Sequence, residues 1–111
     1  LKQGVLACWR TRRTNRMSAG VRYPLHSAAA KGQVANLDLL LNAGCDVNQA
    51  DKNGSTPAYI AAQNGQTAAL DVLVKAGCNV NQATNIGATP ALVAALNGHA
   101  AALDILVKAG C

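Results

Sequence analysis

The feature that most constrains this chain is a segment that recurs every 33 residues. Residues 55–65 are STPAYIAAQNG, residues 88–98 are ATPALVAALNG, and residues 22–32 are a looser version, RYPLHSAAAKG. A fixed period of this length is typical of solenoid arrays, in which one small structural unit stacks on the next. At 111 residues, the chain is expected to form one domain at most.

Each unit carries signals for two short helices. Thr56 followed by Pro57 is typical of a helix start, because the Thr hydroxyl can accept from an unpaired backbone N–H and Pro suits the first helical position. Residues 58–63 favour a helix by composition, and Gly65 can end it in the left-handed conformation. Residues 67–75 predict a second helix, since their apolar residues follow the i, i+3, i+4 spacing.

The rest of the unit predicts a protruding loop. Gly77 ends the second helix, and residues 78–87 are rich in turn-forming residues, which favour a loop or a hairpin. Helices this short are not stable alone in water, so neighbouring pairs must stack to bury their apolar faces. The sequence therefore predicts an all-α array of helix–turn–helix units.

These motifs resemble the ankyrin repeat, and the resemblance extends over roughly residues 18–111. Residues 51–78 and 84–111 are identical at 18 of 28 aligned positions. The resemblance implies an ankyrin-repeat solenoid with protruding β-hairpin loops. The motifs that carry it in the central unit are DKNGSTP at 51–57, Ala61-Ala62, Asn64-Gly65, Leu73-Val74, Ala76-Gly77 and Asn79-Val80-Asn81.

The period divides the chain into a leading segment and three repeats. The chain begins at Leu1 and stops at Cys111, where the next hairpin would begin, so we expect a fragment of a longer array. Leu103, Leu106 and Val107 should then be partly bare, and the chain should be marginally stable or self-associating. The predicted boundaries are a basic leading segment at 1–17 (the remnant of an earlier repeat plus an insertion), repeats at 18–50 and 51–83, and a truncated repeat at 84–111.

The net charge of +5 is concentrated at the start of the chain. Residues 1–22 carry +6 without an acidic residue, whereas residues 23–111 carry −1. One interpretation of Arg10, Arg12, Arg13 and Arg16 is a nuclear-targeting signal or a nucleic-acid-binding arm. The other is a solvated insertion, which is favoured because Trp9 is the sole nearby aromatic residue that could stack on a base.

The cysteines do not predict a metal site or a disulfide. Cys45, Cys78 and Cys111 lie 33 residues apart, at equivalent points on successive units. Packed helices lie about 8–10 Å apart, whereas a disulfide needs Cα atoms within about 7 Å. Zinc sites typically contain Cys-x-x-Cys pairs, which the sequence lacks. We expect these cysteines to act as small apolar residues and Cys8 to be a free thiol, which suits a reducing compartment.

Nothing in the sequence predicts catalysis or membrane insertion. His26 and His99 are the sole histidines, and neither has a Cys, Ser or carboxylate at the spacing of a catalytic or ligand set. His26 matches a position where ankyrin repeats often carry His, but Tyr23 replaces the Thr that usually supports it. There is no G-x-x-x-x-G-K phosphate loop and no apolar run of about 20 residues. We expect no enzyme activity, cofactor, metal or membrane partner.

The resemblance implies a partner-binding groove lined by hairpin tips and first helices, in an intracellular protein of the cytoplasm or nucleus. Ile86 stands where the preceding unit has Asn53, and Leu96 where it has Gln63, so an apolar patch could form an interface core. Single exposed apolar residues without a role are the alternative. The predicted groove residues are Lys31, Asp51, Lys52, Asn53, Ser55, Gln63, Asn64, Thr84, Asn85, Ile86, Ala88, Leu96 and Asn97.

The function predicted from these features is that of a protein–protein interaction scaffold or adaptor. Two alternatives stay open at this point. One is nucleic-acid binding or nuclear targeting through residues 10–16. The other is that the array is the docking segment of a larger enzyme or channel.

Overall fold

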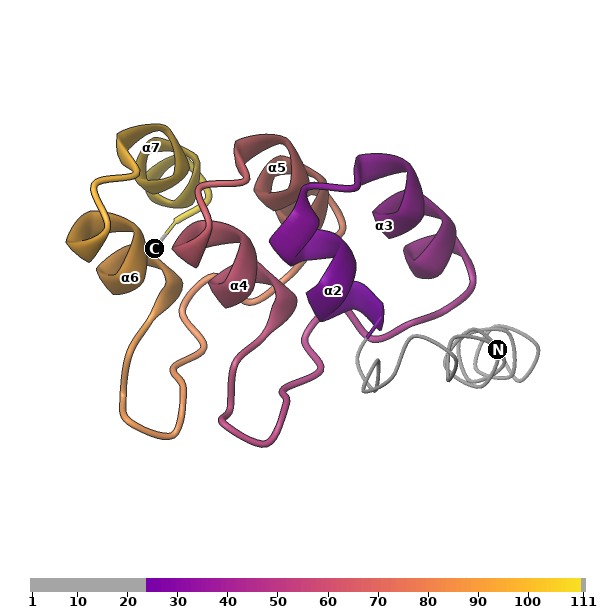
Figure 1. The fold of residues 1–111 in the computed structure, drawn as a ribbon, viewed down its shortest axis with the longest axis horizontal. Helices are drawn as coiled ribbons and strands as arrows, with labels where there is room; N and C mark the ends of the chain where they lie inside the picture. The colour runs from indigo at the N-terminus through magenta and orange to yellow at the C-terminus, as the bar shows by residue number, and fades with distance from the viewer. Residues whose placement is uncertain (1–23, 111) are drawn as a thin grey trace.

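The computed structural model describes residues 24–110 of the chain. Within this range the structure consists of helices and loops, with no residue in a strand (Figure 1). The all-α fold expected from the sequence is therefore confirmed. The helices are α2 (Pro24–Lys31), α3 (Val34–Asn42), α4 (Pro57–Gln63), α5 (Thr67–Lys75), α6 (Pro90–Leu96) and α7 (Ala100–Lys108).

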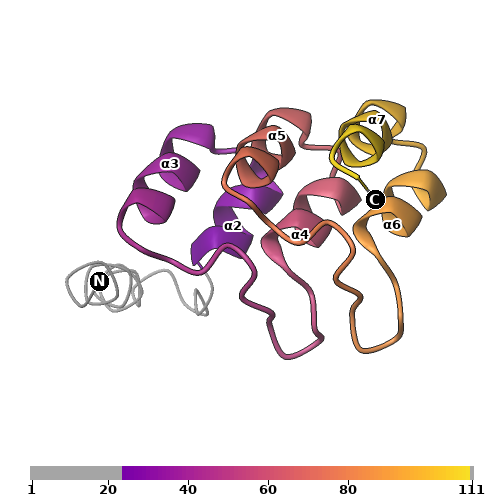
Figure 2. The ribbon, with the colours of Figure 1, turned by 180° about the vertical axis from the view of Figure 1, so that it is seen from behind.

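The helices lie in two layers, which both views of the ribbon show (Figures 1 and 2). In one layer α4 packs between α2 and α6, and in the other α5 packs between α3 and α7. The first helix of each pair also packs against the second, so a single core runs along the array. Its largest fully buried apolar side chains include Leu37, Leu70, Leu73 and Leu106.

The predicted helix boundaries are confirmed by the local hydrogen bonds. Thr56 Oγ1 accepts from the backbone N–H of Tyr59 at 3.2 Å, and Thr89 Oγ1 accepts from that of Leu92 at 3.2 Å. Each Thr therefore caps a helix whose first residue is Pro. Gly65 ends the turn after α4 with a φ of 68°, a conformation that a side chain disfavours.

Two long loops project from the array beyond the layer that contains α2, α4 and α6 (Figure 1). The backbone N–H of Asp51 donates to Ser55 O at 2.9 Å, and that of Thr84 donates to Ala88 O at 2.8 Å. The expected hairpins are thus tight turns closed by these bonds, without paired strands among the described residues. Their tips face the same side of the molecule as the first helices.

The last helix corrects one expectation about exposed apolar residues. Val107 is 58% exposed and Leu103 is half-buried, as expected for a partly bare end. Leu106, however, is fully buried, so the expectation that it is bare was wrong. It occupies the position of Leu73 and Leu40, which point into the core of their own helix pair and need no further repeat to cover them.

Candidate functional site

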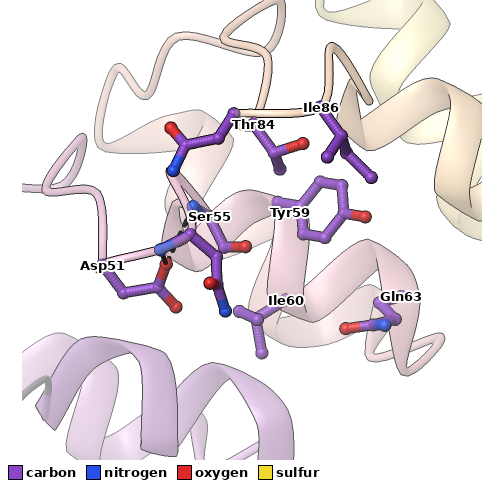
Figure 3. A pocket seen from close by; sticks show the side chains of 9 residues that line it. Asp51, Ser55, Tyr59, Ile60, Gln63, Thr84 and Ile86 are labelled. Atoms are coloured by element: carbon purple, nitrogen blue, oxygen red, sulfur yellow. Dashed lines mark hydrogen bonds between the residues drawn. The ribbon is translucent and has the colours of Figure 1, made fainter.

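A pocket of about 370 Å³ lies between the two loop tips and the exposed side of α4 (Figure 3). It is formed by two successive helix pairs, because the first loop precedes α4 and the second precedes α6. All its lining residues except Tyr59 and Ile60 belong to the groove predicted from the sequence. The lining residues are Asp51, Asn53, Ser55, Tyr59, Ile60, Gln63, Thr84, Asn85 and Ile86.

The first loop tip is held in shape by a carboxylate. Asp51 Oδ1 accepts from the backbone N–H groups of Asn53 and Ser55, at 2.9 and 3.0 Å. Thr84 takes the same position in the second loop, where its Oγ1 accepts from the N–H of Ala88 at 3.2 Å. Short polar side chains commonly fix turns in this way. The Asp51 carboxylate therefore shapes the pocket wall by fixing its turn.

The two loop tips are tied to each other across the junction. The backbone N–H of Asn85 donates to Asn53 O at 3.0 Å, and Asn85 Nδ2 donates to Lys52 O, also at 3.0 Å. Deeper in the loops, the N–H of Asn79 donates to Asn48 Oδ1 at 2.6 Å. These bonds fix one loop against the next, so the pocket is formed before any partner arrives.

The pocket joins an apolar wall to unpaired amide groups. Tyr59 and Ile60 are half-buried against the core, and Ile86 lies on the Tyr59 side of the pocket, 88% exposed (Figure 3). The side-chain amides of Asn53 and Gln63 have no hydrogen-bond partner within residues 24–110. Such a surface can bury an apolar group of a ligand while donating to and accepting from its polar atoms.

The remaining predicted groove residues have different surroundings. Lys31, Lys52 and Leu96 are exposed, with Leu96 at 75%. By contrast, Ser55 and Ala88 are almost buried, so their side chains offer little surface to a partner. The two predicted Asn residues at helix ends are engaged, because Asn64 Nδ2 donates to Ile60 O at 3.0 Å and Asn97 Nδ2 donates to Gln63 O at 3.1 Å. The basic residues Arg10, Arg12, Arg13 and Arg16 lie outside the described range.

His26 contributes to the site indirectly, through the loop that carries Ser55. Its Nε2–H donates to Ser55 O at 2.6 Å, and its side chain is buried. Burial lowers the pKa of His26, an effect opposed by this hydrogen bond and by the nearby Asp51 carboxylate. His26 therefore has a backbone partner in the next loop, although its own repeat has Tyr23 where the family usually has a supporting Thr. Tyr23 itself lies outside the described residues.

The cysteines differ from the prediction in one respect. Cys78 is a free, half-buried thiol, and burial raises its pKa to about 11. Cys45 is disulfide-bonded, so the expectation that it is unpaired was wrong. The spacing argument excludes only a bond between in-register cysteines one repeat apart, and it does not restrict a partner elsewhere in the chain. The prediction for Cys8 falls outside the described residues.

Sequence reasoning missed Tyr59 and Ile60 as pocket residues. A signal was present, because Tyr59 and Leu92 occupy the position at which His26 sits in the first unit. In the structure, the same position directs Tyr59 into the pocket (Figure 3). Among the described residues, no helix combines the length and the apolar character that crossing a bilayer requires.

Comparison with known proteins agrees with this architecture. Residues 22–111 match the family model for ankyrin repeats, which comprises three copies. Among solved structures, the human ASB11 ankyrin repeat domain is similar, with 36% sequence identity, a TM-score of 0.76 and 80% of this chain covered. The match spans 40% of that domain's chain. No curated protein matches the sequence.

Proposed function

Since the chain belongs to the ankyrin-repeat family, whose repeats are generally protein–protein interaction modules, we propose that it binds a partner protein through its loop tips and first helices. The chain would act as a scaffold or adaptor and would have no catalytic role of its own. The binding surface would be centred on the pocket between the two loop tips. Leu96, one repeat beyond Gln63, would extend it along the array.

The observation that carries this proposal is the exposure of Ile86 beside the pocket. Ile86 is 88% exposed, so its side chain buries almost no apolar surface and contributes almost nothing to the stability of the fold. In an interface the same side chain would be removed from water together with the Tyr59 ring. Buried apolar and aromatic side chains of this kind form the centres of protein interfaces.

The fixed geometry of the loops supports the same proposal. Asp51 and Asn85 already hold the tips in place through their hydrogen bonds. A partner would therefore pay little ordering entropy when it binds, and more of the contact energy would appear as affinity. The free amides of Asn53 and Gln63 would provide the polar contacts that orient the partner.

The experiment is a pull-down from cell lysate with the whole chain and with an Ile86→Asp/Leu96→Asp variant. We expect bands captured by the unchanged chain to disappear with the variant, because a charge at either position cannot be desolvated without a counter-charge. The matched control is Leu39→Asp, since Leu39 is a similarly exposed leucine (68%) on α3 in the opposite layer. Circular dichroism verifies that each variant keeps its helices.

Three outcomes of this experiment are informative. Loss of capture in the Ile86→Asp/Leu96→Asp variant alone supports the proposed surface. Equal capture by all three proteins contradicts it. A third outcome is that all three proteins capture the same bands, but that capture is lost at high salt or when Arg10, Arg12, Arg13 and Arg16 are replaced by Ala. This outcome would assign binding to the basic segment.

A further inference from the structure

The pocket between the loop tips contains a negative charge that no lysine or arginine of its own wall balances. Among the residues that line it, Asp51 has the sole charged side chain. Elsewhere in the described range, Asp71 and Asp104 form ion pairs with Lys75 and Lys108, at 2.9 and 3.0 Å. Asp51 forms no ion pair within residues 24–110. A cation that enters the pocket would therefore find an unpaired carboxylate.

One oxygen of this carboxylate is available to a ligand. Both hydrogen bonds that fix the turn, from the N–H groups of Asn53 and Ser55, go to Asp51 Oδ1. Asp51 Oδ2 accepts no hydrogen bond from the described residues. In the described part of the chain no side-chain oxygen is both buried and unpaired, so Oδ2 is open to solvent. Asp51 can thus bind a cation while it continues to hold its turn.

A protein that covers this pocket has to accommodate the charge. The proposed function places the partner over Tyr59 and Ile86, which line the same pocket as Asp51 (Figure 3). Removing a carboxylate from water is strongly unfavourable unless a hydrogen-bonded cation pairs with it. Since the described wall of the pocket supplies no such cation, the partner has to supply one.

The other walls of the pocket suit arginine better than lysine. The Tyr59 ring and Ile86 offer apolar surface to a long side chain, and Asn53 and Gln63 offer unpaired amide oxygens. A guanidinium is planar, is weakly hydrated and donates in several directions, and it can lie on an aromatic ring. An ammonium is a compact, strongly hydrated charge that makes less use of such a wall. The volume of about 370 Å³ is enough for one side chain.

Resting on the proposed function, we propose that the pocket binds an arginine side chain of the partner protein. The guanidinium pairs with Asp51 Oδ2, and the rest of the side chain lies against Tyr59 and Ile86. The charge complementarity also disfavours other occupants, because Asp51 repels an acidic peptide segment or a nucleic-acid phosphate. The partner segment that enters the pocket is therefore basic.

The test is a titration of the whole, ¹⁵N-labelled chain with N-acetyl-arginine amide at low salt. The shifts of the Asn53 and Gln63 side-chain amides report binding at the pocket. The citrulline compound has nearly the same shape without the charge, and the lysine compound has the charge without the planar group. We expect the arginine compound to bind with a millimolar Kd, about fivefold or more tighter than either of the others.

Two variants make the result specific to the Asp51 charge. Asp51→Asn keeps an oxygen that can accept from both N–H groups of the turn, so it should weaken arginine binding by about fivefold and leave citrulline binding unchanged. Asp71→Asn is the matched control, since it removes a carboxylate from α5 in the opposite layer and should change neither Kd. Circular dichroism verifies that both variants keep their helices.

Four results would overturn the proposal. These are arginine binding no tighter than citrulline binding, lysine binding as tight as arginine binding, and equal arginine binding by the Asp51→Asn variant. The fourth is tighter arginine binding when Arg10, Arg12, Arg13 and Arg16 are replaced by Ala, which would identify the basic segment of this chain as the occupant.

The pull-down separates this inference from the proposed function. Bands that are lost with both Ile86→Asp/Leu96→Asp and Asp51→Asn support the two together. Bands that are lost with Ile86→Asp/Leu96→Asp but persist with Asp51→Asn and with excess arginine compound leave the binding surface in place and overturn the arginine inference. Pocket binding of the arginine compound that Asp51→Asn weakens, without capture of any protein that depends on Ile86 and Leu96, supports the arginine site and contradicts the proposed function.

Discussion

The imidazole Nε2 of His26 lies 2.6 Å from the carbonyl oxygen of Ser55, 29 residues further along the chain. This contact connects α2 of one repeat to the loop that enters the next. Because Ser55 N also donates to Asp51 Oδ1, both backbone groups of this residue are fixed. The first turn of the pocket is thus held from the preceding repeat as well as from within.

His26→Ala should destabilise the protein by about 2 kcal/mol, because Ser55 O loses a buried donor and the removed ring leaves a void. Urea unfolding followed by circular dichroism measures the change. His99→Ala is the matched control, since its hydrogen bond to Gln63 O is longer, at 3.1 Å, and exposed. An equal loss in the two variants would contradict the importance assigned to the buried contact.

Stability should also fall with acidification, and the sign follows from His26. Its pKa in the folded protein is lowered from the 6.5 of an unfolded chain, mainly by burial, so folding favours the neutral ring. The neutral ring's contribution to the free energy of unfolding is complete above pH 6.5. It is lost as the pH falls through the lowered pKa that His26 has in the folded protein. Urea midpoints at pH 7.5 and pH 5 should therefore differ more for the unchanged protein than for His26→Gln, which cannot be protonated. Identical pH dependence would show that another group is responsible.

Removing a helix cap should have a measurable cost. Thr56→Ala should lower the free energy of unfolding by about 1 kcal/mol, because the N–H of Tyr59 loses its acceptor at the start of α4. Thr56→Ser keeps the hydroxyl and should lose less. Thermal melts of the two variants measure the difference, and a Ser variant as unstable as the Ala variant would assign the effect to the buried methyl group.

Two glycines with the same backbone conformation should differ in their tolerance of alanine. Gly65 and Gly77 have φ values of 68° and 87°, so alanine at either position costs roughly 1–2 kcal/mol of strain. At Gly65 the new Cβ would also lie 2.7 Å from His99 Nδ1, whereas at Gly77 nothing lies within 4 Å. Gly65→Ala should therefore be the more destabilising by about 1 kcal/mol in urea unfolding, through the displaced His99 bond. Equal losses would mean that His99 moves aside without cost.

The Cys78 thiol should react slowly in the native protein. Burial raises its pKa from 9.0 to about 11, so at pH 8 the reactive thiolate is roughly 100-fold rarer than in an unfolded chain. Iodoacetamide labelling followed by peptide mass spectrometry measures the rate at this position. The same protein in urea is the control, and equal rates in both conditions would contradict the buried environment.

Most of the helical framework could be predicted from local signals. The Thr-Pro starts, the glycine ends and the apolar spacing of residues 67–75 correspond to α4 and α5 as observed, because each depends on residues within one helix. The Asp71–Lys75 pair, four residues apart, likewise forms an ion pair of 2.9 Å. Such features are determined within a single repeat, where sequence neighbours are also spatial neighbours.

Features that depend on two repeats were harder to predict. The sequence indicates that Gln66 and His99 share a position, but not that each reaches back to a carbonyl of the preceding helix pair. The contribution of Tyr59 to the pocket was missed for the same reason, since it depends on the loop of the next repeat. The disulfide bond of Cys45 was missed as well, because the spacing argument considered only cysteines one repeat apart.

The pocket between the loop tips belongs to a junction, because Tyr59 comes from one repeat and Ile86 from the next (Figure 3). This has a consequence for how such an array can change over generations. Replacing the repeat that carries Tyr59 would change one wall of this pocket, and replacing the repeat that carries Ile86 would change the other. A change of binding specificity in one repeat therefore always acts together with a wall that the neighbouring repeat supplies.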